Sequence, residues 1–168
     1  MQPPDRVLFN FEEPSAATRW FPINDGVMGG LSSSDVVAEP GYAAFRGTVS
    51  LEFGGGFASV RSRPELVDLA ECAGIALFVG GDGKRYKFNV KNEPTFDGVL
   101  YESAFDTASG NWQVVRLPFA DFRPVYRGRP VPGAPPLDPT AIRSFGLMIS
   151  ERQAGPFRLE LSWIAGYR

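Results

Sequence analysis

Hydrophobic and polar side chains alternate with a period of two along much of this chain. In residues 85–91, RYKFNVK, apolar side chains at Tyr86, Phe88 and Val90 alternate with polar ones at Arg85, Lys87, Asn89 and Lys91. Successive side chains of a β-strand point to opposite faces of its sheet. The pattern therefore predicts a strand with its apolar side in a core and its polar side facing outward.

Similar short patterns recur and predict further strands. They lie around residues 9–11, 42–53 (two runs split at Gly47), 57–62, 99–105, 112–117, 145–149 and 157–163. A continuous apolar run at 75–79 is followed by the turn sequence GGDGK at 80–84, so we expect residues 75–79 and 85–91 to form a hairpin. Helical periodicity is weak; two turns are predicted at 65–72 and single turns at 118–122 and 139–142.

Composition supports an all-β chain. Among 168 residues there are 19 glycines and 15 prolines, which interrupt helices and favour turns. About ten short strands predict two packed antiparallel sheets with helix below roughly 15%. We expect one domain, a β-sandwich spanning residues 1–168.

Two compositional features restrict the chemistry. The chain has no histidine and a single cysteine, Cys72, which excludes histidine-dependent catalysis, internal disulfides and the usual zinc sites. Cys72 lies between apolar residues and is predicted to be a small buried side chain. Neither nucleotide-binding nor nucleophile motifs occur. We therefore expect no enzyme activity, no cofactor and no catalytic metal; a structural calcium ion stays open.

The overall charge and the N-terminal sequence indicate partners and location. Lys and Arg total 17 and Asp and Glu 19, a net charge of −2, so nucleic acid is not an expected partner. The apolar runs are much shorter than the ~20 residues of a membrane-spanning helix. The first residues resemble neither a secretion signal nor a transit peptide, so we expect a cytoplasmic protein.

One sheet face is the first candidate for binding. The polar side of residues 85–91 faces away from the core, and residues on neighbouring strands extend it. Several cations in one patch need an anionic or polyhydroxylated partner, with Glu102 as the nearest internal carboxylate. The candidate residues are Arg61, Arg85, Lys87, Asn89, Tyr101 and Glu102.

Two loops are further candidates. In residues 24–34, NDGVMGGLSSS, the residues Asn24, Asp25, Gly29 and Gly30 form either a tight crossing locked by local hydrogen bonds or a backbone cradle for a ligand. Residues 124–139 contain six prolines and are expected to form a long surface loop. Within it, Tyr126, Arg127 and Arg129 are alternative binding residues.

Several motifs occur together in an order typical of one family. They include WFPINDGVMGGLSSSD at 20–35, GGFASVRS at 55–62, GDGKRYKFNV at 81–90, NWQVVRLPFADF at 111–122 and GPFRLELSWI at 155–164. The chain resembles the complex I intermediate-associated protein 30 (CIA30) family. The resemblance implies a galactose-binding-like jelly roll, related to carbohydrate-binding modules, without catalytic activity.

The resemblance also implies a function. Eukaryotic members assist assembly of respiratory NADH:ubiquinone oxidoreductase, so the expected partner is a membrane-complex subunit or an assembly intermediate. The alternative is a module that binds a carbohydrate or another small polar ligand. An enzyme is the third and least supported hypothesis, because the catalytic motifs are missing.

Overall fold

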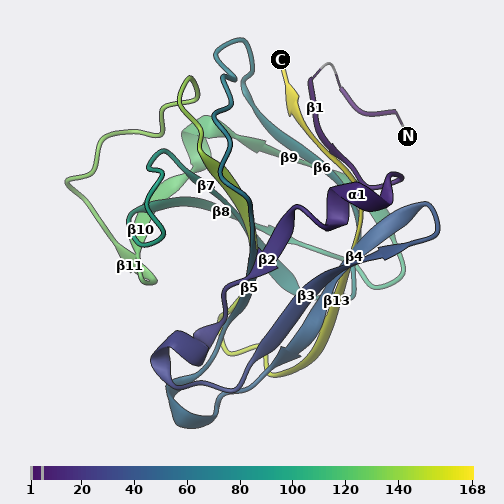
Figure 1. The fold of residues 1–168 in the computed structure, drawn as a ribbon, viewed down its shortest axis with the longest axis vertical. Coiled ribbons are helices and arrows are strands. Elements are labelled where there is room, and N and C mark those ends of the chain that lie inside the picture. Colours follow the sequence, from purple (N-terminus) through teal and green to yellow (C-terminus); the bar gives the residue numbers. More distant parts are fainter. Residues whose placement is uncertain (1, 5) are drawn as a thin grey trace.

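Two antiparallel β-sheets lie face to face in the computed structural model, which describes residues 2–4 and 6–168 (Figure 1). Sheet A contains, in spatial order, β3 (Ser33–Glu39), β4 (Tyr42–Val49), β13 (Gly155–Tyr167), β6 (Gly74–Gly80) and β9 (Trp112–Pro118), and β1 (Arg6–Asn10) also pairs with β13. Sheet B contains β11 (Arg129–Pro130), β10 (Arg123–Tyr126), β8 (Leu100–Asp106), β7 (Arg85–Lys91), β12 (Ser144–Ile149), β5 (Ala58–Ser62) and β2 (Trp20–Pro22). The predicted β-sandwich is confirmed.

Helices contribute little to the structure. Strands hold 52% of the residues and helices 7%. The helical segments are α1 (Pro14–Ala17) and the 3₁₀ turns η1 (Asp25–Met28), η2 (Glu52–Gly54) and η3 (Phe119–Asp121). Of the predicted helical turns, the one at 118–122 is present as η3, and the one at 139–142 is present as a non-helical turn at residues 139–140. In the described residues, no helix could span a membrane.

The predicted two-turn helix at 65–72 is wrong. Residues 65–69 instead pair with residues 139–143: Val67 and Ile142 exchange two backbone hydrogen bonds of 2.8 and 3.0 Å, and the Leu69 N–H donates to the Pro139 carbonyl at 2.7 Å. A turn follows at 70–71. At 139–142 a turn does form, with the Ala141 N–H donating to the Asp138 carbonyl at 3.4 Å, but no helical element. Leu69 is buried in the core, while Cys72 is half-buried at the core's edge.

The expected hairpin of residues 75–79 and 85–91 is also wrong, because β6 and β7 belong to different sheets. The Gly-Asp-Gly segment between them crosses from sheet A to sheet B. Asp82 holds this crossing: its carboxylate accepts hydrogen bonds from the Tyr86 hydroxyl at 2.8 Å and the Arg158 N–H at 2.9 Å. A glycine-rich turn thus joins sheets rather than neighbouring strands.

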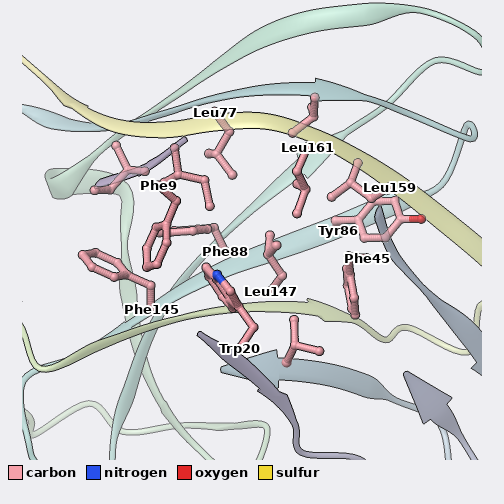
Figure 2. Close-up of a cluster of buried hydrophobic side chains, with 14 of the residues drawn as sticks. Phe9, Trp20, Phe45, Leu77, Tyr86, Phe88, Phe145, Leu147, Leu159 and Leu161 are labelled. Atoms are coloured by element: carbon pink, nitrogen blue, oxygen red, sulfur yellow. The ribbon is translucent and has the colours of Figure 1, made fainter. Parts of the chain in front are cut away.

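The apolar faces of the two sheets meet in one aromatic-rich core. Figure 2 shows large side chains from both sheets packed together, among them Phe9, Phe45, Tyr86, Phe88 and Phe145. All five are at most 3% exposed. The residues predicted to point inward from 85–91 are therefore buried as expected.

A bulge in β13 changes which residues face this core. The pairing of β13 with β6 shifts register between Leu161 and Trp163. Leu161 lies in the core, but after the bulge Ile164 takes the core position, and Trp163 joins a separate cluster with Ala76 and Ala165. Simple alternation from 157 had placed Trp163 on the core side, which is wrong because a bulge adds one residue to the strand.

Two expected irregular segments are partly strands. β3 begins at Ser33, inside the predicted 24–34 loop, and β4 runs without a break through Gly47. A Cβ added at Gly47 would lie 1.9 Å from the Ser33 carbonyl oxygen, so this glycine allows the two strands to approach. The second segment is the predicted surface loop at 124–139, whose first part pairs as the β10–β11 hairpin. In its turn, Arg127 and Gly128 both have positive φ (48° and 79°), as a type I′ hairpin turn requires.

Candidate binding face

The outward side of sheet B brings most of the predicted binding residues together. Strand register aligns Arg61 with Gly146, Gly146 with Asn89, and Asn89 with Glu102 across β5, β12, β7 and β8. These residues alternate with core residues on their own strands, so they share the face that points away from sheet A. We call this surface the B face.

Tyr101 does not belong to the B face. It pairs with Val90, a core residue, and is itself 5% exposed within the core. Its hydroxyl donates a 2.6 Å hydrogen bond to the Pro135 carbonyl. The sequence expectation for Tyr101 is thus corrected: neighbouring strands in register place it on the opposite side from Glu102.

Ion pairs occupy one end of the B face. The Arg85 guanidinium lies 3.0 Å from an Asp106 oxygen and 3.2 Å from a Glu151 oxygen. The Lys87 ammonium lies 3.7 Å from a Glu102 oxygen. Burial raises the pKa of Glu102, although Lys87 acts in the opposite direction. Glu102, the carboxylate expected to compensate these positive charges, is therefore paired with Lys87.

The middle of the B face is covered by neighbouring groups. Asn89 points outward, as predicted, yet it is only 4% exposed. Its amide lies over Gly146, where an added Cβ would be 2.1 Å from the Asn89 side-chain oxygen. The missing side chain at Gly146 provides the space that Asn89 fills.

A strap crosses the B face beyond Asn89. The strap consists of residues 93–98, between β7 and β8, and its residues are mostly exposed. On one side, the Arg61 guanidinium donates a 2.7 Å hydrogen bond to the Phe96 carbonyl. On the other side, the Asp97 carboxylate accepts hydrogen bonds from Tyr126 at 2.9 Å and Arg127 at 2.8 Å. The strap therefore links β5 to the β10–β11 hairpin, which lies at the sheet edge in Figure 1.

Two predicted loop residues thus meet the B face, and one residue was missed. Tyr126 and Arg127 contact the strap, whereas Arg129 is exposed on β11. Lys91 was not among the candidates, although the alternation that selected Lys87 also places Lys91 on the same side. It is buried at 2% exposure beneath this part of the face. The alternation pattern was the signal that could have identified it.

The 24–34 candidates are used by the fold itself. The fully buried Asp25 carboxylate accepts hydrogen bonds from the Ser32 N–H at 2.9 Å, the Gly56 N–H at 2.8 Å and the Phe57 N–H at 3.3 Å, and also from the Ser32 hydroxyl. Burial alone would raise the pKa of Asp25, but these hydrogen bonds outweigh it and lower the pKa. Asp25 therefore joins the motif at 24–34 to the motif at 55–62.

Neighbouring residues support the same junction. The Asn24 side-chain oxygen accepts hydrogen bonds from the Ser34 hydroxyl at 2.6 Å and the Ser59 N–H at 3.0 Å. A Cβ at Gly30 would lie 2.4 Å from the Asp25 side chain, and Gly29 has φ +88°. Of the two interpretations of this segment, the tight crossing describes these contacts, although its hydrogen bonds reach residues 56–59 as well as residues within the segment.

The described residues show little that could bind a metal ion. They contain no group of three His, Cys, Asp or Glu side chains placed to hold one.

Comparison with known proteins places the chain in a family. The family model of complex I intermediate-associated protein 30 (CIA30) matches residues 9–161. The chain belongs to the CIA30 family. An uncharacterized protein of Schizosaccharomyces pombe is 33% identical over 179 residues, covering 94% of this chain and 82% of the relative.

Another CIA30 relative carries the family name. Mouse "Complex I intermediate-associated protein 30, mitochondrial" is 27% identical over 180 residues. The match covers 95% of this chain but 55% of the mouse protein, so the chain spans little more than half of that relative.

Solved structures share the CIA30 fold seen here. A family 11 carbohydrate-binding module from a cellulosomal cellulase of Clostridium thermocellum superposes with a TM-score of 0.72 at 16% identity, covering 99% of this chain and 97% of the module. The same kind of module in complex with a β-1,3-1,4-mixed-linked tetrasaccharide gives a TM-score of 0.69 at 17% identity, covering 96% and 95%. These likenesses establish the carbohydrate-binding-module type of jelly roll.

Proposed function

We propose that this chain is a non-catalytic binding module that assists the assembly of a multisubunit complex, with respiratory NADH:ubiquinone oxidoreductase as that complex. The observation that carries the proposal is the family match over residues 9–161, together with the mouse relative whose name states association with a complex I intermediate. Family membership supports this partner class, and the B face is the surface that we propose for it.

The B face suits recognition of a partner surface. Its charged groups are held by ion pairs, such as Lys87 with Glu102 and Arg85 with Asp106, rather than projecting freely into water. Side chains held in place lose less conformational entropy on binding. Complementary charges on a partner would then determine its orientation and its rate of association.

Capture of assembly intermediates tests this proposal. Tagged protein would be isolated from native lysates of the organism that encodes it, and co-purified oxidoreductase subunits would be quantified by mass spectrometry. We expect enrichment with the native chain and a clear loss with Arg85→Ala/Lys87→Ala. The matched control, Asp35→Ala/Arg46→Ala, removes an exposed ion pair of sheet A and is expected to retain capture. Absence of oxidoreductase subunits, or equal loss in both variants, would contradict the proposal.

A glycan-binding module is the second candidate. Two exposed aromatic side chains border the polar groups of the B face: Phe96 is 63% exposed and Tyr126 is 39% exposed. Aromatic rings beside amide and guanidinium groups are suited to a ligand with apolar and polar sides. A glycan array with the intact protein separates this candidate from the first, because a complex-assembly module should leave the array unlabelled.

The cytoplasmic location expected from the sequence stays a prediction. Fractionation of cells that carry the tagged chain would test it. Recovery of the chain with another compartment would contradict it.

A further inference from the structure

Lys91 has an ammonium group without a partner. The side chain is 2% exposed, and its Nζ has no hydrogen-bond partner within residues 2–4 and 6–168. The other two lysines of the chain differ: Lys84 donates to the Pro156 carbonyl at 2.7 Å, and Lys87 pairs with Glu102. A buried ammonium group is costly unless something compensates its charge. The three N–H donors of Lys91 are therefore available to a group that reaches it once the strap over it opens.

The charges around Lys91 leave a positive excess. Burial lowers the pKa of Lys91, and the nearby Arg61 charge lowers it further, while Glu93 and Asp97 act in the opposite direction. The carboxylate of Asp97 is already paired with Arg127 at 2.8 Å. Two cations, Lys91 and Arg61, then face the carboxylate of Glu93, which accepts a 3.4 Å hydrogen bond from the Thr95 hydroxyl and forms no ion pair within residues 2–4 and 6–168. One further negative charge would balance the group.

We propose that Lys91 and Arg61, with the Asn89 amide beside them on the B face, bind one carboxylate of an acidic peptide segment. A single carboxylate matches the single excess positive charge, whereas a dianion would be opposed by Glu93. The inference rests on the proposed binding role of the B face and names the chemistry of its partner. Arg61 supplies a planar fork that fits a carboxylate, and Lys91 supplies a point charge.

The spacing of side chains along β7 matches that of an extended peptide. The cations Lys87 and Lys91 are four residues apart on one side of β7, which is about 13 Å along a strand. In an extended peptide, side chains at every second residue point the same way at about 7 Å intervals. An acidic peptide lying along β7 can therefore place one carboxylate at Lys91 while the rest of the peptide lies over the Lys87–Glu102 ion pair.

The strap controls access to Lys91. A Cβ added at Gly98 would lie 2.5 Å from a Glu93 side-chain oxygen and 3.4 Å from Lys91 Nζ, so the Glu93 carboxylate and the Lys91 ammonium group both lie beside the strap at Gly98. Exposed contacts hold the strap, including the bond from Arg61 to the Phe96 carbonyl and the Asp97–Arg127 ion pair. Segments held by few exposed contacts open at low free-energy cost. Binding requires the strap to lift and Arg61 to exchange a carbonyl for a carboxylate.

Titration with hexaglutamate tests the assignment, with hexaglutamine as the neutral control peptide. Calorimetry is expected to detect binding of hexaglutamate only. Lys91→Met should weaken that binding at least tenfold and also raise the Tm, because it removes an unpaired buried charge. The matched control, Lys84→Met, should bind within twofold of the native chain. A purely structural Lys91 would produce a lower Tm and unchanged affinity, which would overturn the inference.

Lysine NMR supplies a readout that does not need a variant at position 91. With only three lysines, the side-chain Cε resonances can be assigned singly. Hexaglutamate should shift the Lys91 resonance and leave that of Lys84 unchanged, and Arg61→Gln should reduce the shift. An unmoved Lys91 resonance, or tighter binding of inorganic phosphate than of hexaglutamate, would overturn the carboxylate assignment.

Failure of this inference can be distinguished from failure of the proposed function. Unchanged hexaglutamate affinity in Lys91→Met overturns the inference alone, if Arg85→Ala/Lys87→Ala still abolishes capture of oxidoreductase subunits. Loss of hexaglutamate binding in Lys91→Met supports the inference even where those subunits are not captured, in which case the assembly role fails.

Discussion

Replacing Asp25 with asparagine provides the sharpest test of how the 24–34 segment is used. The native carboxylate accepts four hydrogen bonds, three from backbone N–H groups of Ser32, Gly56 and Phe57 and one from the Ser32 hydroxyl. An asparagine amide keeps only one oxygen. It retains most bonds when this oxygen faces Gly56 and Phe57, which leaves the Ser32 N–H directed at an NH₂ group.

The expected decrease in the free energy of unfolding follows from these hydrogen bonds. A buried N–H without an acceptor costs about 1–3 kcal/mol, and the two remaining backbone bonds lose their charge assistance, at about 0.5–1 kcal/mol each. Asp25→Asn should therefore lower the free energy of unfolding by about 2–5 kcal/mol. For a chain of this size, that corresponds to a decrease in Tm of roughly 4–20 °C.

The loss of stability in Asp25→Asn should be larger at neutral pH than at acidic pH. Because the folded-state pKa of Asp25 is lowered, the stability it contributes is fully present above its unfolded pKa, near 4, and is lost as the pH falls through the folded-state value. The difference between the native chain and Asp25→Asn should be largest at pH 7 and decrease below about pH 4.

Urea unfolding at pH 7 and pH 3, followed by tryptophan fluorescence, measures both effects. Asp35→Asn is the control, because Asp35 has an exposed side chain and only a surface ion pair with Arg46 at 3.4 Å. It should change stability by at most about 0.5 kcal/mol. A loss below 1 kcal/mol for Asp25→Asn, or increased stability, would refute the structural role and favour a ligand cradle at Asn24–Gly30.

Two further predictions concern the B face. Gly146→Ala should destabilise the fold by about 1–3 kcal/mol, because its Cβ would meet the Asn89 amide. Adding Asn89→Ala in the same chain should recover part of this loss of stability. Additive effects of the two substitutions in a double-mutant cycle, measured by urea unfolding, would contradict this packing. Hydrogen bonds from Arg127 and Tyr126 lower the pKa of Asp97, so its carboxylate is charged at pH 7 and holds the strap. Asp97→Asn at pH 7 should therefore speed amide hydrogen exchange in the strap while leaving the Tm within about 2 °C. Unchanged exchange in the strap would show that these hydrogen bonds do not hold it.

The sequence by itself determined the fold class and the inward side of several strands. Alternation in a strand is a local property of the backbone, because consecutive side chains must point to opposite faces. Tyr86, Phe88 and Val90 therefore had to share one side, and their bulk required a core. The same reasoning placed Arg85 and Lys87 on the opposite side, where the structure has them.

The family motifs could likewise be recognised from the sequence, but their physical role could not. The motif at 24–34 meets the motif at 55–62 because the Gly56 and Phe57 N–H groups donate hydrogen bonds to Asp25. These donors lie 31 and 32 positions after Asp25 in the chain. Turn propensity describes only neighbouring residues, so it could not distinguish a self-contained turn from a buried junction between distant segments.

Only the tertiary structure decided how strands are assigned to sheets and which outward residues are covered. The turn at 80–84 was compatible with a hairpin, and its use as a crossing depends on the partners of β6 and β7 in separate sheets. The bulge in β13 reverses the side on which Trp163 lies, because one extra residue shifts a period of two. Alternation places Asn89 and Lys91 on the outward side, but their burial depends on Gly146 and on the strap, which contact them across the sheet. Such contacts depend on the packing of the whole chain and leave no periodic signal in the sequence.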